Sequence, residues 1–156
     1  MLKGEKMNTL IIYKSVHKMN TEKVARAMAE AINADIRKVE DAKSSMLAKY
    51  DLIGFGSGIY YGKHHETLLD FVNGLPQQEG KAAFVFSTSG GSIKSMNREL
   101  RRALMEKGFT IKGEFTCPGF ETFGVFGLIG GFRKGRPNVK DLDKAQKFAK
   151  GLLQAP

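Results

Sequence analysis

Three short segments of the chain combine hydroxyl, amide and glycine residues in a pattern that suits a phosphate group or a flat polar ring. The first segment runs from Ser15 to Thr21 and carries Asn20 beside that threonine. The second is "GSGIYYGK", residues 56–63, and the third is "STSGG", residues 87–91. Uncharged donors with little bulk let several N–H and O–H groups approach one ligand. Such chemistry requires a fold that brings the three segments together.

Strand and helix patterns alternate along the whole chain. The strand patterns fall within residues 9–13, 34–40, 50–62, 81–92 and 109–115, and the range 50–62 starts as a buried strand and ends in a glycine-rich loop. The helix patterns start near Asn20 and cover residues 65–75, 92–108 and 139–153. This alternation predicts an α/β fold with a doubly wound, five-stranded parallel sheet, strand order 2-1-3-4-5, and helices on both faces.

The three polar segments follow the first, third and fourth expected strands. Because the strands are parallel, these segments leave the same carboxyl edge of the sheet, and ligands of open α/β sheets bind at that edge where the strand order reverses. Asn20 or Thr21 would lie at the start of a helix, where free N–H groups favour an anion. Tyr60 or Tyr61 would offer a ring for stacking. Each segment also has a plainer interpretation. The first segment could only cap a helix, the tyrosines of the second could only cover the end of the sheet, and the third could be an ordinary turn.

Together, these features resemble the flavodoxin family over roughly residues 7–153. "YKSVHKMNTEKVARAMAEAI" is similar to the family's phosphate loop, "GFGSGIYYGKHHETLLDFV" to its second flavin loop and "FSTSGG" to its third. The resemblance implies a flavodoxin-like fold that binds flavin mononucleotide (FMN). It implies a phosphate site formed by Ser15, His17, Lys18, Met19, Asn20 and Thr21. It implies that one side of the flavin contacts Ser57, Ile59, Tyr60, Tyr61 and Gly62, and that the other contacts Thr88, Ser89, Gly90 and Gly91.

Three features depart from the family pattern. Met19 replaces the usual glycine of the phosphate loop, and the chain has no tryptophan for stacking. The chain is basic, with a formal net charge of +9, whereas many flavodoxins are acidic. A cation such as Lys63 near the ring would favour the reduced anion. We therefore expect a less reducing flavin than in acidic relatives and a redox protein partner with an acidic surface.

Several other residues leave more than one interpretation open. "HHE", starting at His64, lacks the spacing of a metal site, and histidines at the start of a helix are usually solvated. "IYYGKHH" is also similar to a loop of flavodoxin-type protoporphyrinogen oxidases, which implies a proton-relay or substrate role for His64. Cys117 is expected to pack at a strand end rather than to react. The phenylalanine- and glycine-rich segment 119–132 suits either a core cover or a partner surface.

Length and composition indicate the number of domains and the cellular location to expect. We expect a single flavodoxin-like domain over residues 1–156, with 1–6 as a frayed lead-in. The apolar runs are too short for a membrane span or a secretory signal, and one cysteine suits a reducing cytoplasm. We expect no bound metal and, in the absence of a recognised motif, no nucleic-acid partner.

Three functions remain open from the sequence. The first is an FMN-binding protein that shuttles one or two electrons to a protein partner. The second is a small FMN-dependent oxidoreductase that acts on a quinone, a porphyrin or a similar planar substrate. The third is a basic interaction module that has lost its cofactor, for which Met19 is the main support.

Overall fold

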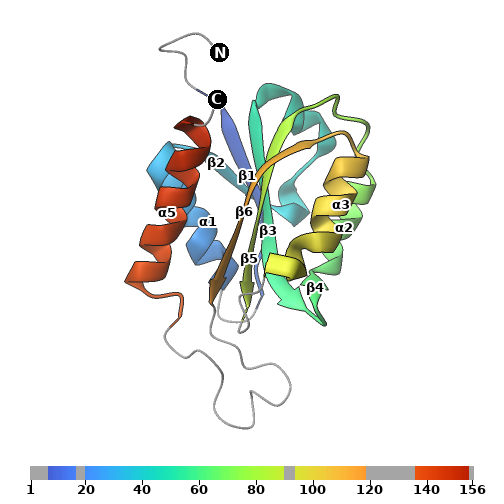
Figure 1. Ribbon diagram of the computed structural model, residues 1–156. Coiled ribbons are helices and arrows are strands. Elements are labelled where there is room, and N and C mark those ends of the chain that lie inside the picture. Colours follow the sequence, from blue (N-terminus) through green and yellow to red (C-terminus); the bar gives the residue numbers. More distant parts are fainter. Residues whose placement is uncertain (1–6, 17–19, 90–93, 119–135, 155–156) are drawn as a thin grey trace.

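The computed structural model describes residues 7–16, 20–89, 94–118 and 136–154, and shows a largely parallel β-sheet between two layers of helices (Figure 1). The main path of the sheet has the order β2-β1-β3-β5-β6, with parallel pairing throughout. These strands are β1 (Thr9–Lys14), β2 (Asp35–Lys38), β3 (Leu52–Tyr60), β5 (Ala82–Ser89) and β6 (Thr110–Pro118). The predicted order 2-1-3-4-5 is confirmed, since β4 (Lys63–His64) only extends β3 as a short antiparallel hairpin.

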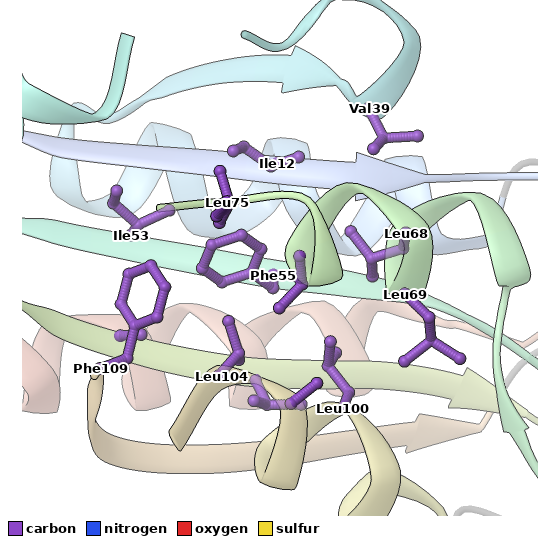
Figure 2. Close-up of a cluster of buried hydrophobic side chains, with 14 of the residues drawn as sticks. Ile12, Val39, Ile53, Phe55, Leu68, Leu69, Leu75, Leu100, Leu104 and Phe109 are labelled. Atoms are coloured by element: carbon purple, nitrogen blue, oxygen red, sulfur yellow. The ribbon is translucent and has the colours of Figure 1, made fainter. Parts of the chain in front are cut away.

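Helices cover both faces of the sheet because side chains of a buried strand alternate between two cores. Ile11 and Phe84 pack with residues of α1 (Asn20–Ile32) and α5 (Val139–Gln154) on one face. Leu10, Ile12 and Phe55 pack on the other face with residues of α2 (Glu66–Asn73) and α3 (Arg98–Glu106). Figure 2 shows this second core, to which Leu68 of α2 and Leu104 of α3 both contribute side chains over the central strands.

The glycines of β3 are part of the strand and make room for phenylalanine rings. A Cβ atom on Gly54 would lie 2.2 Å from Cζ of Phe84, and one on Gly56 would lie 2.3 Å from the ring of Phe86. The prediction that 50–62 ends in a glycine-rich loop was therefore wrong. The strand continues to Tyr60 and turns directly into β4. Glycine is usually unfavourable in a strand, but here the neighbouring rings fill the space that its missing side chain leaves.

Two further elements differ from the sequence pattern. Within the predicted helix 92–108, the described part begins with a 3₁₀ turn, η3 (Lys94–Asn97), and α3 starts only at Arg98. Within the predicted strand 34–40, pairing stops at Lys38 and a 3₁₀ turn, η1 (Val39–Asp41), follows. A second 3₁₀ segment, η2 (Ser44–Lys49), leads into β3. Gly108, with a φ of +89°, follows α3 as the predicted stop.

Residues 1–6 and the segment 119–132, for which the sequence makes specific predictions, lie outside the described residues. Cys117 is buried at the end of β6, as expected. Across the part of the chain that the structure describes, none of the helices combines the length and apolar character needed to span a bilayer.

Candidate functional site

The carboxyl edge of the sheet brings the three polar segments together. Lys14 at the end of β1 pairs with Ser57 of β3, and Gly58 pairs with Thr88 of β5. The start of α1 reaches the same place, since Thr21 Oγ1 lies 2.7 Å from Thr88 Oγ1. Segments that are far apart in the sequence are thus neighbours at one edge.

The first segment is shaped by a helix cap. Ser15 Oγ accepts a hydrogen bond from the backbone N–H of Glu22 at 3.1 Å, so one N–H of the first turn of α1 is already satisfied. Asn20 and Thr21, at the helix start, are buried. Tyr13 donates to the Glu22 carboxylate at 2.6 Å, and burial, helped by this bond, raises the pKa of Tyr13 to about 12. Predicted residues His17, Lys18 and Met19 lie outside the described residues.

The second segment is a tight hairpin rather than a loop. Tyr61 and Gly62 form its two-residue turn and both have positive φ angles, 53° and 83°. Two successive positive φ angles are typical of the turn that joins antiparallel strands without splaying them. Tyr61 is 86% exposed at the tip. Tyr60 contacts His65 edge to face, with 5.0 Å between ring centres, and Ile59 is half-buried.

The third segment continues the buried strand β5. Thr88 and Ser89 are 4% and 9% exposed, so their hydroxyl groups lie at a largely enclosed rim. Ser89 Oγ lies 3.8 Å from Sδ of Met96, which connects the rim to η3. The predicted residues Gly90 and Gly91 lie outside the described residues.

A buried polar cluster lies behind the hairpin. His64 is 1% exposed; its Nδ1 atom is 2.8 Å from Ser57 Oγ and its Nε2 atom is 2.7 Å from Asn97 Oδ1. Burial lowers the pKa of His64 to about 4, although the Asn97 contact acts in the opposite direction. The expectation that these histidines are solvated was wrong for His64, because β4 directs it inward. His65 is half-buried and caps α2 by accepting the N–H of Thr67.

Sequence reasoning missed Asn97 altogether, and it assigned Ser57 to the flavin without its hydrogen-bonding role. Asn97 stands within a helix-like pattern and has no distinguishing spacing. For His64 a signal existed: "YG" between two short strand-like stretches favours a two-residue hairpin, in which alternate residues point inward.

A groove of about 480 Å³ adjoins the hairpin between α2 and α3. Its lining includes the cations Lys63, Arg98 and Arg102, which form no ion pair within the described ranges. Glu99 and Glu106 also line it. The remaining lining residues are uncharged: Gly62, Leu69, Asn73, Ser95, Met96 and Ala103.

The rim itself contains no carboxylate among the predicted site residues, all of which are uncharged except His17 and Lys18. Such a donor set suits an anionic or neutral polar ligand better than a cation. The residues that the structure describes contain no group of three or more His, Cys, Asp or Glu residues able to hold a metal ion.

Comparison with known proteins identifies the family and supports the fold. A family model described as a flavodoxin domain matches residues 10–123. An uncharacterised protein of Methanocaldococcus jannaschii is 48% identical over 150 residues, which cover 95% of this chain and 99% of that protein. Oxidised flavodoxin 2 from Bacillus cereus has the same fold, with a TM-score of 0.72, 18% identity and coverage of 94% and 98% of the two chains. A flavodoxin from the domain Archaea gives a TM-score of 0.64 at 21% identity, with coverage of 95% and 97%. The chain belongs to the flavodoxin domain family.

Proposed function

We propose that this protein binds FMN at the carboxyl edge of its sheet and carries electrons to a protein partner. The observation that carries the proposal is the contact between Thr21 and Thr88, because it joins the predicted phosphate segment to the predicted ring segment. The match of a flavodoxin domain model to residues 10–123 also supports the proposal.

The residues at the rim fit FMN in their chemistry. The N-terminus of α1, a helix of 13 residues, lies beside Ser15 and suits a phosphate, because the backbone N–H groups of a first helical turn favour an anion. In this proposal residues 15–21 hold the phosphate, residues 59–62 cover one side of the ring, and residues 88–91 contact the other. The Ser57 hydroxyl is engaged behind the hairpin, so Ser57 would contribute through its backbone.

When bound, FMN supplies the one- or two-electron chemistry. The chain supplies the positioning and the electrostatic environment. Tyr61 is placed to shield the ring from the tip of the hairpin, and the exposed Lys63 next to it adds a positive charge. A positive charge at that point stabilises negative charge that develops on reduction.

The groove beside the hairpin supports a partner with an acidic surface. Lys63, Arg98 and Arg102 line it without ion pairs in the described structure, and a partner's carboxylates would be attracted to them. Docking there would bring the partner's redox centre next to the hairpin. The proposed location is the cytoplasm, where a lone unpaired thiol such as the buried Cys117 persists.

The same groove favours a second function, an FMN-dependent oxidoreductase for a quinone, porphyrin or similar planar substrate. A groove of about 480 Å³ is in the usual size range for small-molecule sites. His64 has no direct part in such a reaction, because its ring is enclosed and both nitrogen atoms face protein groups.

Anaerobic reductive titration of the FMN-loaded protein, followed by assays with a water-soluble quinone, separates the two functions. The carrier function predicts reduction in two resolved one-electron steps and no saturable turnover of the quinone. Saturable turnover that is lost when the groove is filled from its exposed wall by Asn73→Trp, but kept in the exposed control Ala48→Trp, would establish the oxidoreductase instead.

A further inference from the structure

The buried cluster of Ser57, His64 and Asn97 has no part in the proposed chemistry. We propose that His64 is a positioning residue: as a neutral bridge between Ser57 and Asn97, it holds the hairpin and η3 in one fixed arrangement. This inference rests on the proposed function, because the bridge would fix the distance between the two segments that face the flavin ring.

The cluster joins three separate elements. Ser57 lies near the end of β3, His64 lies in β4 and Asn97 is the last residue of η3. All three side chains are at most 1% exposed. The contacts of 2.8 Å and 2.7 Å on the two nitrogen atoms of His64 are therefore protected from competition with water.

The hydrogen-bond partners of His64 determine which of its two ring nitrogen atoms carries the hydrogen. Asn97 Oδ1 accepts only, so the Nε2 atom of His64 carries the hydrogen and donates it. The Nδ1 atom of the neutral ring is then an acceptor for the Ser57 hydroxyl, whose oxygen accepts the N–H of His65 at 3.0 Å. The same hydroxyl also lies 2.7 Å from the carbonyl oxygen of Gly58. Its single hydrogen is therefore shared between two acceptors, this carbonyl oxygen and His64 Nδ1.

Asn97 depends on His64 for its orientation. Its Nδ2 atom is buried and has no hydrogen-bond partner among the described residues, so the contact of Oδ1 with His64 is what anchors the amide. Although Asn97 stands at the N-cap of α3, its side chain makes no cap hydrogen bond. Its role is to connect η3 to His64 rather than to stabilise the helix start.

The bridge connects η3 to β3, the strand that pairs with β5. On one side, Gly58, next to Ser57, pairs with Thr88 in the sheet. On the other, η3 begins at Lys94, a few residues after Ser89, and is anchored through Asn97. Fixing the elements around a site before a ligand arrives reduces the ordering cost of binding. The bridge therefore contributes to affinity without touching the ligand.

The binding test uses FMN and riboflavin as paired probes. Because the bridge acts on the ring side, Asn97→Ala and His64→Ala are expected to weaken the binding of both probes equally, by about tenfold. Ser15→Ala, on the phosphate side, should weaken FMN more than riboflavin. Ser45→Ala, at an exposed position on η2, is the control that should change neither. Unchanged affinity in Asn97→Ala, which carries the test if His64→Ala does not fold, would overturn the inference, as would an effect on FMN alone.

A second test needs no cofactor. The amide of His65 donates to Ser57, whereas Asn97 does not contact it. In the cofactor-free protein, Asn97→Ala should speed hydrogen exchange at the His65 amide by about tenfold, since loss of the bridge loosens the hairpin from η3. Exchange that matches the wild type would refute the bridge. A wild-type protein that takes up no FMN would instead refute the proposed function, and this exchange measurement would still decide the bridge.

Discussion

The hydroxyl oxygens of Thr21 and Thr88 lie 2.7 Å apart, although 67 residues separate them in the sequence. Both side chains are buried, at 2% and 4% exposure. The contact joins the first turn of α1 to the end of β5. It is the direct structural link between two segments that the sequence assigns to one ligand.

A double-mutant cycle on Thr21 and Thr88 measures the interaction free energy between their hydroxyl groups. Thr21→Val and Thr88→Val should each lower the free energy of unfolding by about 1 kcal/mol, because each leaves a buried hydroxyl without its partner. The double variant should cost less than the sum of the two, since it removes both partners at once. Denaturant titration gives these values, with the exposed Thr110→Val as the control. Strictly additive losses would show that the two hydroxyls do not interact.

The stability of the protein should fall below neutral pH through His64. Burial lowers the pKa of His64 to about 4 from its usual 6.5, so the unfolded chain takes up the proton more readily than the folded one. The contribution of the neutral ring is complete above pH 6.5 and is lost as the pH falls from 6.5 to about 4. The total loss is about 3 kcal/mol.

Denaturant titrations of the wild type and of His64→Gln between pH 7 and pH 4 check this dependence. We expect the difference in the free energy of unfolding between the two proteins to shrink steadily toward low pH. His65, whose pKa is also lowered, chiefly by burial, is present in both proteins and drops out of the comparison. Parallel curves across this range would contradict the assigned environment of His64.

Gly54 should tolerate no side chain. A Cβ atom there would lie 2.2 Å from Cζ of Phe84, which is completely buried and packs against Phe86 and Phe148. Gly54→Ala is expected to cost about 3 kcal/mol of unfolding free energy through overpacking. Gly151→Ala, at an open position on α5, should be neutral or stabilising by up to about 1 kcal/mol. Thermal or denaturant unfolding that ranks the two variants equally would refute the packing of β3 against β5.

Charge reversal in the groove should alter reactivity toward charged oxidants. For the reduced, FMN-loaded protein, Arg98→Glu with Arg102→Glu should slow oxidation by anionic ferricyanide and speed oxidation by cationic hexaamminecobalt(III), each by about tenfold at low salt. The control, Lys147→Glu with Lys150→Glu at exposed positions of α5, changes the net charge by the same amount on the other face of the sheet. Stopped-flow rates that respond equally to both double variants would place the partner surface elsewhere.

The sheet order and the shared edge follow from sequence because they depend on patterns spread over many residues. "LIIY" and "AAFVF" are apolar without interruption, and parallel strands then have only a few arrangements. The hairpin of Tyr61 and Gly62 and the inward turn of His64 depend on single residues and on two φ angles. Asn97 could not be predicted at all, since its partner lies 33 residues away and its own neighbours read as a helix. Binding by His17, Lys18, Met19, Gly90 and Gly91 stays a prediction, because they lie outside the described residues.

Fluorescence titration of the cofactor-free protein with FMN, repeated with riboflavin, tests whether the carboxyl edge of the sheet binds FMN. We predict quenching that saturates at one FMN per chain, with weaker binding of riboflavin because it lacks the phosphate that the start of α1 receives. Thr88→Val should weaken both ligands, while Thr110→Val should leave both unchanged. Fluorescence that stays unquenched when FMN is in large excess over the protein would contradict the account.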